Sequence, residues 1–242
     1  ELGADKITGI VMSAKPLNRA HERLIRLVLD KSDLVILFLQ KPYVKEESLP
    51  FEVRLEALNL LVDNYLPKKR VLVVPLEKTY IFAGINELIL DALLLQNFGC
   101  TKFVIGREHT GLGMYYEHQQ TKSIFDTLKG LSISIEISSN FVYCDSCKTL
   151  VSTQTCPHGQ HHHISYHSSS ILELLEAGLL PPPMLVRKEI AAIYLSYLFP
   201  RRFKNLEKIY ADMIPGTGLI EAHNERDFYI ELAKLYQTTS LT

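Results

Sequence analysis

Short apolar runs alternate with helix-like stretches over the first 105 residues, and this alternation restricts the fold more than any other feature of the chain. The apolar runs cover residues 7–12, 34–39, 71–76 and 102–105. Between them lie three stretches with apolar side chains at the spacing of one helical face: residues 20–29, 50–65 and 85–98. Strands that are apolar throughout are buried on both faces, which is typical of a parallel sheet covered by helices on each side. The sequence therefore predicts a doubly wound α/β domain.

The pattern changes after Ile135. A short helix is expected over 169–177, and the triple proline at 181–183 then predicts a rigid, extended connector, because each proline fixes its own φ. Helical periodicity returns over three stretches: 187–199, 205–213 and 227–236. We therefore expect an α/β domain over 1–180, which includes a zinc knuckle at 141–165, and a helical C-terminal subdomain over 181–242.

Three of the four cysteines lie in one short segment: Cys144, Cys147 and Cys156. A Cys-x2-Cys pair places two thiolates on one turn, and a third cysteine with an imidazole completes a tetrahedral set suited to zinc. The alternatives are a disulfide pair and an unliganded loop. Four histidines are within reach as the fourth ligand: His158, His161, His162 and His163. We take His162 as that ligand and expect a structural zinc site, since three sulfurs and one nitrogen leave no open position for catalysis.

The 242 residues carry a formal net charge of −1, with 47% hydrophobic and 22% charged side chains. This balance gives no reason to expect a nucleic acid or an acidic membrane surface as a partner. No stretch resembles a secretion signal or a membrane span. Together with cysteines grouped for metal binding, this predicts a cytoplasmic protein. Because the chain begins with Glu1 rather than methionine, we expect it to be part of a longer polypeptide.

Two loops follow predicted strands at their carboxyl ends, where open α/β sheets bind ligands. The first covers residues 12–21 and the second residues 106–113. In the second loop, glycines such as Gly106 and Gly111 let backbone N–H groups approach an anion, and Arg107 and His109 can add charge-assisted hydrogen bonds. This loop predicts a nucleotide or phosphate site, with a plain structural turn as the alternative.

Several motifs then occur in a specific order. They are Pro16-Leu17-x-Arg19-Ala20-His21, Pro50-Phe51 to Arg54, Asn97-Phe98-Gly99-Cys100-Thr101, Gly106-Arg107-Glu108-His109-Thr110-Gly111, Phe141-x-Tyr143-Cys144-x2-Cys147 with Cys156-Pro157-His158, and Pro182-Pro183 to Arg187-x-Glu189. In this order they resemble the catalytic domain of ATP sulfurylase (sulfate adenylyltransferase) from Ile7 to about Tyr197.

The resemblance implies a Rossmann-like nucleotidylyl-transferase domain. In that family sulfate attacks the α-phosphorus of Mg-ATP to give adenylyl sulfate and pyrophosphate. The reaction requires no covalent enzyme intermediate, so positioning and charge stabilisation provide the catalysis. The implied ligands are a structural zinc ion, Mg-ATP and adenylyl sulfate. The resemblance also implies an additional N-terminal domain, which these 242 residues do not include.

The family's anion-binding motif reads Gln-x-Arg-Asn-Pro-x-His-x-x-His, in which the arginine holds sulfate and the histidines hold phosphates. Its places are filled here by Met12, Ala14, Lys15, Pro16, Asn18 and His21. By this resemblance His21 keeps its role, while Asn18 offers a hydrogen bond without charge. Lys15 supplies a cation near the place of the absent arginine. We therefore take His21, Lys15 and Arg107 as catalytic candidates. The nucleotide-binding candidates are Asn18, Gly106, His109 and Gly111.

Two further segments, 80–87 and 166–172, also lack arginines that the resemblance predicts. At least four arginines of the family's anion site are thus neutral or apolar here. Each charge-assisted contact contributes about 1.5–3 kcal/mol, so weak sulfate binding is expected unless other groups substitute.

Three hypotheses follow from these replacements. The chain is an ATP sulfurylase with a rearranged site, a nucleotidylyl-transferase with another acceptor, or a catalytically silent paralogue. A silent paralogue would act as a binding partner, in a homo-oligomer or with an intact sulfurylase. The sequence does not choose among them, since likeness of fold does not transfer activity.

Overall fold

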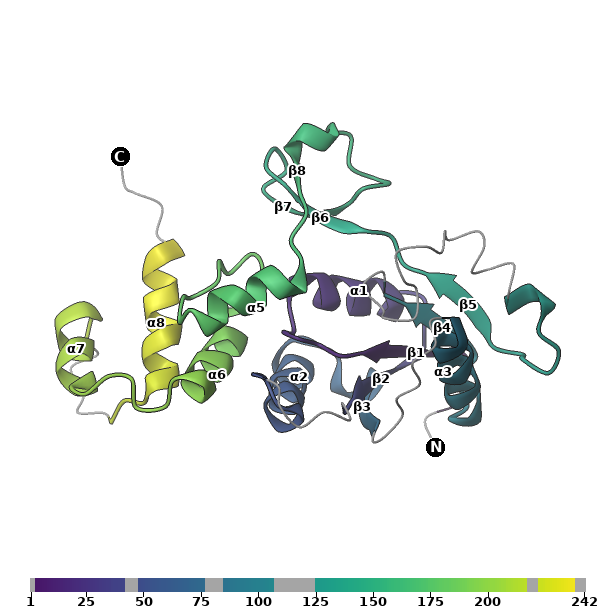
Figure 1. Cartoon of the computed structure of the whole chain (residues 1–242), viewed down its shortest axis with the longest axis horizontal. Helices are drawn as coiled ribbons and strands as arrows, with labels where there is room; N and C mark the ends of the chain where they lie inside the picture. Colours follow the sequence, from purple (N-terminus) through teal and green to yellow (C-terminus); the bar gives the residue numbers. More distant parts are fainter. Residues whose placement is uncertain (1–2, 42–47, 77–84, 107–124, 217–221, 238–242) are drawn as a thin grey trace.

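The central element of the computed structural model is one parallel sheet (Figure 1). The structure describes residues 3–41, 48–76, 85–106, 125–216 and 222–237. Within them the strand order is β3-β2-β1-β4-β5, and each neighbouring pair is parallel. The strands are β1 Ile7–Met12, β2 Leu34–Gln40, β3 Val71–Leu76, β4 Lys102–Ile105 and β5 Ser134–Ile137. The order reverses direction at β1, which confirms the doubly wound, Rossmann-like arrangement.

Both faces of the sheet are covered, as the continuously apolar strands predicted. In β1, Ile10 and Met12 belong to the core shared with α1 (Arg19–Leu29) and α2 (Phe51–Tyr65). Val11 faces the opposite way, into the core under α3 (Ile85–Asn97). Because side chains alternate along a strand, a strand with helices on both sides needs apolar residues at every position.

The strand β5 was not predicted. Its four residues, Ser-Ile-Glu-Ile, alternate polar and apolar side chains, and none of them is fully buried. Among the described strands, it lies at one edge of the sheet. This strand lacks the continuous apolar run by which the other four strands of the sheet were recognised.

Helix α3 approaches β1 closely at Gly9. A Cβ atom at this position would lie 2.3 Å from Cδ2 and 2.7 Å from Cγ of Leu95, which is buried on α3. Glycine is therefore required by the packing of helix on strand.

We expect Gly9→Ala to lower the free energy of unfolding by about 1–3 kcal/mol, the usual cost of overpacking a core. Urea denaturation measures this change. Gly106→Ala is the matched control, because among the described residues the nearest atom to its Cβ would be Leu24 Cδ2 at 3.8 Å. Equal stability of the two variants would contradict this description of the contact.

The guanidinium of Arg54 joins three segments at the carboxyl edge of the sheet. Arg54 is 0% exposed and donates hydrogen bonds to the carbonyl oxygens of Ser13, Gln40 (3.2 Å) and Leu49 (3.1 Å). These carbonyls lie after β1, at the end of β2 and just before α2. A buried cation is tolerated when its donors are satisfied in this way, and the three loops are held together as a result.

A second buried network joins α1 to α6 (Lys188–Leu198). Glu22 accepts hydrogen bonds from Arg187 at 2.6 and 2.8 Å and from Arg26 at 3.0 Å. The Arg187 guanidinium also stacks on the ring of Tyr65 in α2, 3.5 Å from its centroid. Burial by itself raises the pKa of Glu22, but these hydrogen bonds outweigh it and lower the pKa to about 2.

This lowered pKa predicts an acid-sensitive contribution to stability. The contribution is present above the carboxyl's ordinary pKa of 4.5 and is lost as the pH falls toward about 2. Glu22→Gln should therefore lower the free energy of unfolding at pH 7 by on the order of 3 kcal/mol, and the deficit should shrink between about pH 5 and pH 2. Urea denaturation at several pH values tests this, with the exposed Glu176→Gln on α5 as the control. If Glu22→Gln were equally destabilised at pH 3 and pH 7, the loss would not come from the charge of the Glu22 carboxylate.

The C-terminal helices pack onto the α/β body. Helix α6 contacts α2, α5 (Ser168–Glu176) and α8 (Glu225–Gln237), and α7 covers Leu206–Met213. Residues 190–195 of α6 belong to the same core as α1 and α2. The buried Tyr194 hydroxyl accepts a hydrogen bond from the Leu17 N–H at 3.0 Å. Helix α6 thus shares a core with the sheet. The expected boundary between an α/β domain ending at residue 180 and a helical subdomain starting at 181 stays a prediction.

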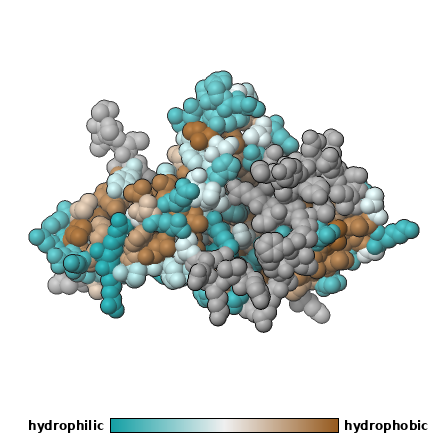
Figure 2. Space-filling view, in the orientation of Figure 1, coloured by the Kyte–Doolittle hydropathy of each residue, from teal (hydrophilic) through white to brown (hydrophobic). Residues whose placement is uncertain are grey.

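A second, three-stranded sheet projects from the body (Figure 1). Its order is β7-β6-β8, with β6 Phe141–Cys144, β7 Thr149–Ser152 and β8 His163–Ile164, and both pairs are antiparallel. The tip of this sheet is hydrophilic in Figure 2. No helix in the described part of the chain has the length and apolar character needed to cross a membrane.

Candidate functional site

Two adjoining cavities lie at the carboxyl ends of β1 and β4. The larger has a volume of about 350 Å³ and the smaller about 180 Å³. His21, Leu24 and Gly106 line both of them. Because the strand order reverses between β1 and β4, the cavities occupy the switch point where sheets of this topology bind ligands.

The smaller cavity brings together three of the predicted site residues. Lys15, His21 and Gly106 line it, together with Ser168 at the start of α5. Asn18 lines the larger cavity beside His21 and Gly106. Three other predicted residues lie outside the described part of the chain: Arg107, His109 and Gly111.

Asn18 and His21 form a capping box at the start of α1. The Asn18 Oδ1 atom accepts hydrogen bonds from the N–H groups of Ala20 (3.0 Å) and His21 (3.2 Å). In return, His21 Nδ1 accepts from the Asn18 N–H at 3.2 Å. An accepting Nδ1 places the proton of a neutral imidazole on Nε2. His21 can thus offer an N–H donor in a fixed orientation.

The amide nitrogen of the Asn18 side chain contacts a second helix, α5. Its Nδ2 atom donates to Ser168 Oγ at 3.1 Å, so the beginnings of α1 and α5 meet at the cavities. The Asn18 side chain is 8% exposed, and both of its ends are used in these contacts. Its observed role is to hold two helices rather than to present a donor to the cavity.

The larger cavity has an aromatic and neutral lining. Phe141, Tyr143 and Tyr166 form its aromatic part, and several serine and asparagine side chains add hydrogen-bonding groups. Among the described residues that line it, none is Lys, Arg, Asp or Glu. The two cavities therefore differ in chemistry, since Lys15 lines only the smaller one.

Ala14 occupies the place for which the sequence comparison implied a sulfate-holding arginine. Its side chain is 0% exposed, and its φ of 51° lies in the left-handed region. A non-glycine residue in this conformation costs on the order of 1–2 kcal/mol. The Ala14 side chain is buried and provides no charge at this position.

Three thiols and one imidazole meet in the projecting sheet: Cys144, Cys147, Cys156 and His158. The His158 Nδ1 atom lies 3.4, 3.3 and 3.6 Å from the three sulfurs, and Cys147 Sγ lies 3.9 Å from Cys156 Sγ. Zinc bonds of about 2.3 Å to sulfur and about 2.0 Å to nitrogen, in a tetrahedron, place ligand atoms about 3.5–3.8 Å apart. The group therefore has the size and donor chemistry of a zinc site, and all three cysteines are free thiols.

The pKa of one of the thiols, Cys147, agrees with this fit. Burial and the neighbouring Cys144 and Cys156 thiols raise the pKa of Cys147 to about 11. Several thiolates this close together repel one another, and a divalent cation between them removes that penalty. This cluster could hold a metal ion.

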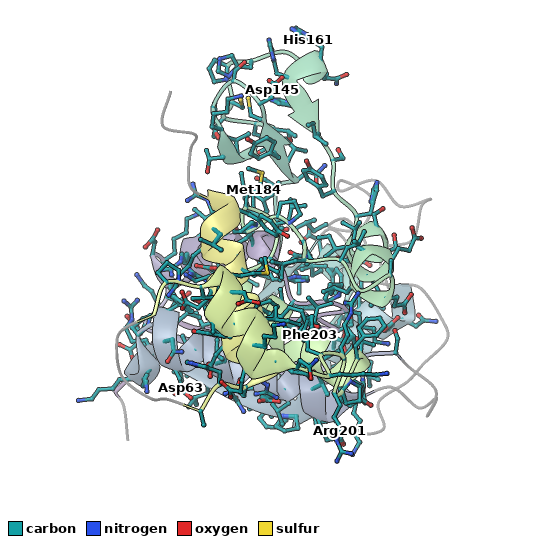
Figure 3. All side chains as sticks on the ribbon, turned by 90° about the vertical axis from the view of Figure 1, so that its left-hand side faces the viewer. Asp63, Asp145, His161, Met184, Arg201 and Phe203 are labelled. Atoms are coloured by element: carbon teal, nitrogen blue, oxygen red, sulfur yellow. The ribbon has the colours of Figure 1, made fainter. Side chains whose placement is uncertain are left out.

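The structure places His158, and not the expected His162, in this group. His162 Nδ1 instead lies 2.7 Å from Asp145 Oδ1 and 3.1 Å from Ser146 Oγ. His161 packs against His162, and its labelled side chain lies at the outer end of the projecting sheet in Figure 3. The expectation for His162 is corrected because four histidines lay within sequence reach and only the folded hairpin brings one ring to the sulfurs.

Metal titration distinguishes these two histidines. We expect His158→Ala to weaken cobalt(II) binding by about 100-fold or more, because a direct ligand is lost. His162→Ala should leave the visible spectrum of the tetrahedral cobalt complex unchanged. A shifted spectrum in His162→Ala and an unchanged one in His158→Ala would reverse the assignment.

Sequence reasoning missed most of the larger cavity. Ser138, Ser139 and Asn140 come from the connection between β5 and β6, and Leu150 comes from β7. No spacing rule links these positions to the loop at 12–21. The only available signal was the motif Phe141-x-Tyr143-Cys144, which placed two aromatic residues beside the first cysteine.

The sheet order and the cavities at its switch point define a Rossmann-like α/β protein with a candidate ligand site. Comparison with known proteins is more specific, because the ATP-sulfurylase family model matches residues 1–197. This chain belongs to the ATP-sulfurylase family. Helices α7 and α8 lie beyond the matched region.

The relatives support this membership. The sulfate adenylyltransferase of Chloroflexus aurantiacus is 36% identical over 180 residues, which cover 74% of this chain and 47% of the relative. That of Carboxydothermus hydrogenoformans is 34% identical over 184 residues, covering 75% and 48%. The chain thus spans about half the length of the curated relatives it matches. A hexameric APS kinase from Thiobacillus denitrificans has a TM-score of 0.60 at 16% identity, covering 79% of this chain and 36% of that one, which shows likeness of fold.

Proposed function

We propose that this chain binds an adenine nucleotide, ATP or adenylyl sulfate, in the two cavities and acts as the nucleotidylyl-transferase part of a sulfate adenylyltransferase. The observation that carries the proposal is the meeting of Lys15, His21 and Gly106 at the switch point of the sheet. Membership of the ATP-sulfurylase family supports the nucleotide as the ligand. The smaller, cationic cavity suits the phosphates, and the larger, neutral one suits the nucleoside.

The residues would act by position and charge. His21 Nε2 would donate to a phosphate oxygen, because Nδ1 is occupied by the Asn18 N–H. Lys15 would add a point charge to the same oxygens. Magnesium bound to ATP would neutralise further phosphate charge. Such groups stabilise the charge of an in-line displacement without forming a covalent bond to the enzyme. Arg107, His109 and Gly111 remain proposed ligands of the phosphates.

A second candidate is nucleotide binding without sulfate chemistry. It is favoured by Ala14, which is buried and neutral at the place of the implied sulfate-holding arginine. In that case the chain would use another acceptor or bind nucleotide as a silent partner, with itself or with an intact sulfurylase.

Isothermal titration tests these candidates. A non-hydrolysable ATP analogue with magnesium and adenylyl sulfate are titrated separately into the zinc-loaded protein. We expect micromolar binding of both if the site serves sulfate adenylylation. Binding of the ATP analogue alone would favour the second candidate, and binding of neither would overturn the proposed site.

His21→Asn gives a sharp test of the phosphate contact. Asparagine Oδ1 can replace Nδ1 as the acceptor of the capping box, whereas the Nε2 donor is lost. We expect affinity for the ATP analogue to fall about 10- to 100-fold, which is the range for a hydrogen bond to a charged group. The unfolding midpoint should stay near that of the unmodified protein. Unchanged affinity in His21→Asn would contradict the assigned contact.

A further inference from the structure

The projecting sheet forms part of the wall of the larger cavity. Phe141 and Tyr143 on β6 and Leu150 on β7 line it, and Tyr143 is followed directly by the thiol Cys144. Only 8% of Tyr143 and 0% of Cys144 is exposed. Strand β6 therefore contributes both to the sulfur cluster and to the wall of the larger cavity.

A short path of strand pairing joins the sulfur cluster to the remaining wall. On β8, His163 pairs with Cys144 and Ile164 with Tyr143. The chain then continues through Ser165, Tyr166 and His167, which all line the larger cavity. It ends at Ser168, whose hydroxyl accepts the Asn18 hydrogen bond at the start of α1. The path therefore consists of the β6–β8 pairing, five consecutive residues of the chain and one side-chain hydrogen bond, all among described residues.

Two tyrosines on this path lie against each other. The rings of Tyr143 and Tyr166 have centroids 6.4 Å apart and planes inclined by 60°, an edge-to-face contact. Tyr143 lies on β6 and Tyr166 two residues after the end of β8, and both line the larger cavity. In a lining without charged groups among the described residues, aromatic faces of this kind suit a flat, neutral heterocycle.

We propose that the metal-holding sheet is the part of the ligand site that recognises the ring of the nucleotide. Tyr143 and Tyr166 are its specificity-determining residues, and loading of the Cys144, Cys147, Cys156 and His158 group sets how well this wall is formed. The inference rests on the proposed nucleotide binding. It assigns to the metal a role in ligand affinity beyond stability of the hairpin.

Tyrosine variants of the zinc-loaded protein test the wall directly. Tyr143→Leu and Tyr166→Leu keep apolar bulk but remove the aromatic face. We expect each to weaken binding of a non-hydrolysable ATP analogue about 10- to 100-fold, the range for loss of a base–aromatic stack, with little effect on inorganic tripolyphosphate. The matched control is Tyr197→Leu, which changes a tyrosine that is 47% exposed on α6 outside both cavities. Wild-type affinity in both wall variants would overturn the inference.

Removal of the metal tests the coupling. Chelator-treated protein should lose at least tenfold in affinity for the ATP analogue while it retains tripolyphosphate binding, and added zinc should restore the loss. Equal affinity with and without zinc would overturn the coupling. If the metal-free protein unfolds and loses affinity for both the ATP analogue and tripolyphosphate, the tyrosine variants of the zinc-loaded protein decide whether this wall recognises the nucleotide. Failure of the unmodified zinc-loaded protein to bind the analogue would instead overturn the proposed function, so the two failures are distinguishable.

Discussion

The buried guanidinium of Arg54 is the interaction on which the carboxyl edge of the sheet depends. It holds the carbonyl groups of Ser13, Gln40 and Leu49, and therefore fixes the end of β1 against the end of β2 and the start of α2. A charge that is fully buried must keep all of these partners, because an unmet donor in the interior costs more than the hydrogen bond contributes. The loop that carries Lys15 begins at Ser13, and both Ser13 and Gln40 line the smaller cavity. The hydrogen bonds of Arg54 therefore also position part of this cavity's lining.

From that edge, two different environments arise within one site. The smaller cavity gathers Lys15 and His21 where a charge can be bound, while the larger one is enclosed by aromatic and hydroxyl side chains. A ligand with a charged end and a flat neutral end matches this division. The capping box of Asn18 and His21 lies between the two, and through Ser168 it also connects the first helix of the body to the chain that returns from the projecting sheet.

The inner strands and the helices over them were predictable because burial on both faces leaves an unambiguous apolar run. The edge strand β5 and the small strands β6, β7 and β8 were not, since their short segments mix polar and apolar residues. In addition, β5 pairs with β4 and β8 with β6, which are not their neighbours in a local hairpin. In the candidate site, the loop after β1 and Gly106 after β4 followed from a general rule of parallel sheets. Ser138, Leu150 and Tyr166 carry no comparable signal, because they reach the cavity only through the path of the chain.

By itself the sequence determined the doubly wound sheet, the grouping of three cysteines suited to a metal and the resemblance to ATP sulfurylase, because each is encoded in local spacing or in the order of motifs. Only the tertiary structure decided that His158, rather than His162, meets the sulfurs, and that the projecting sheet lines the same cavity as His21. Those outcomes depend on distances between segments distant in the chain, such as Tyr143 and His21. Local periodicity contains no information about such distances, since they are set by packing of the whole core and by the pairing of β6 with β8.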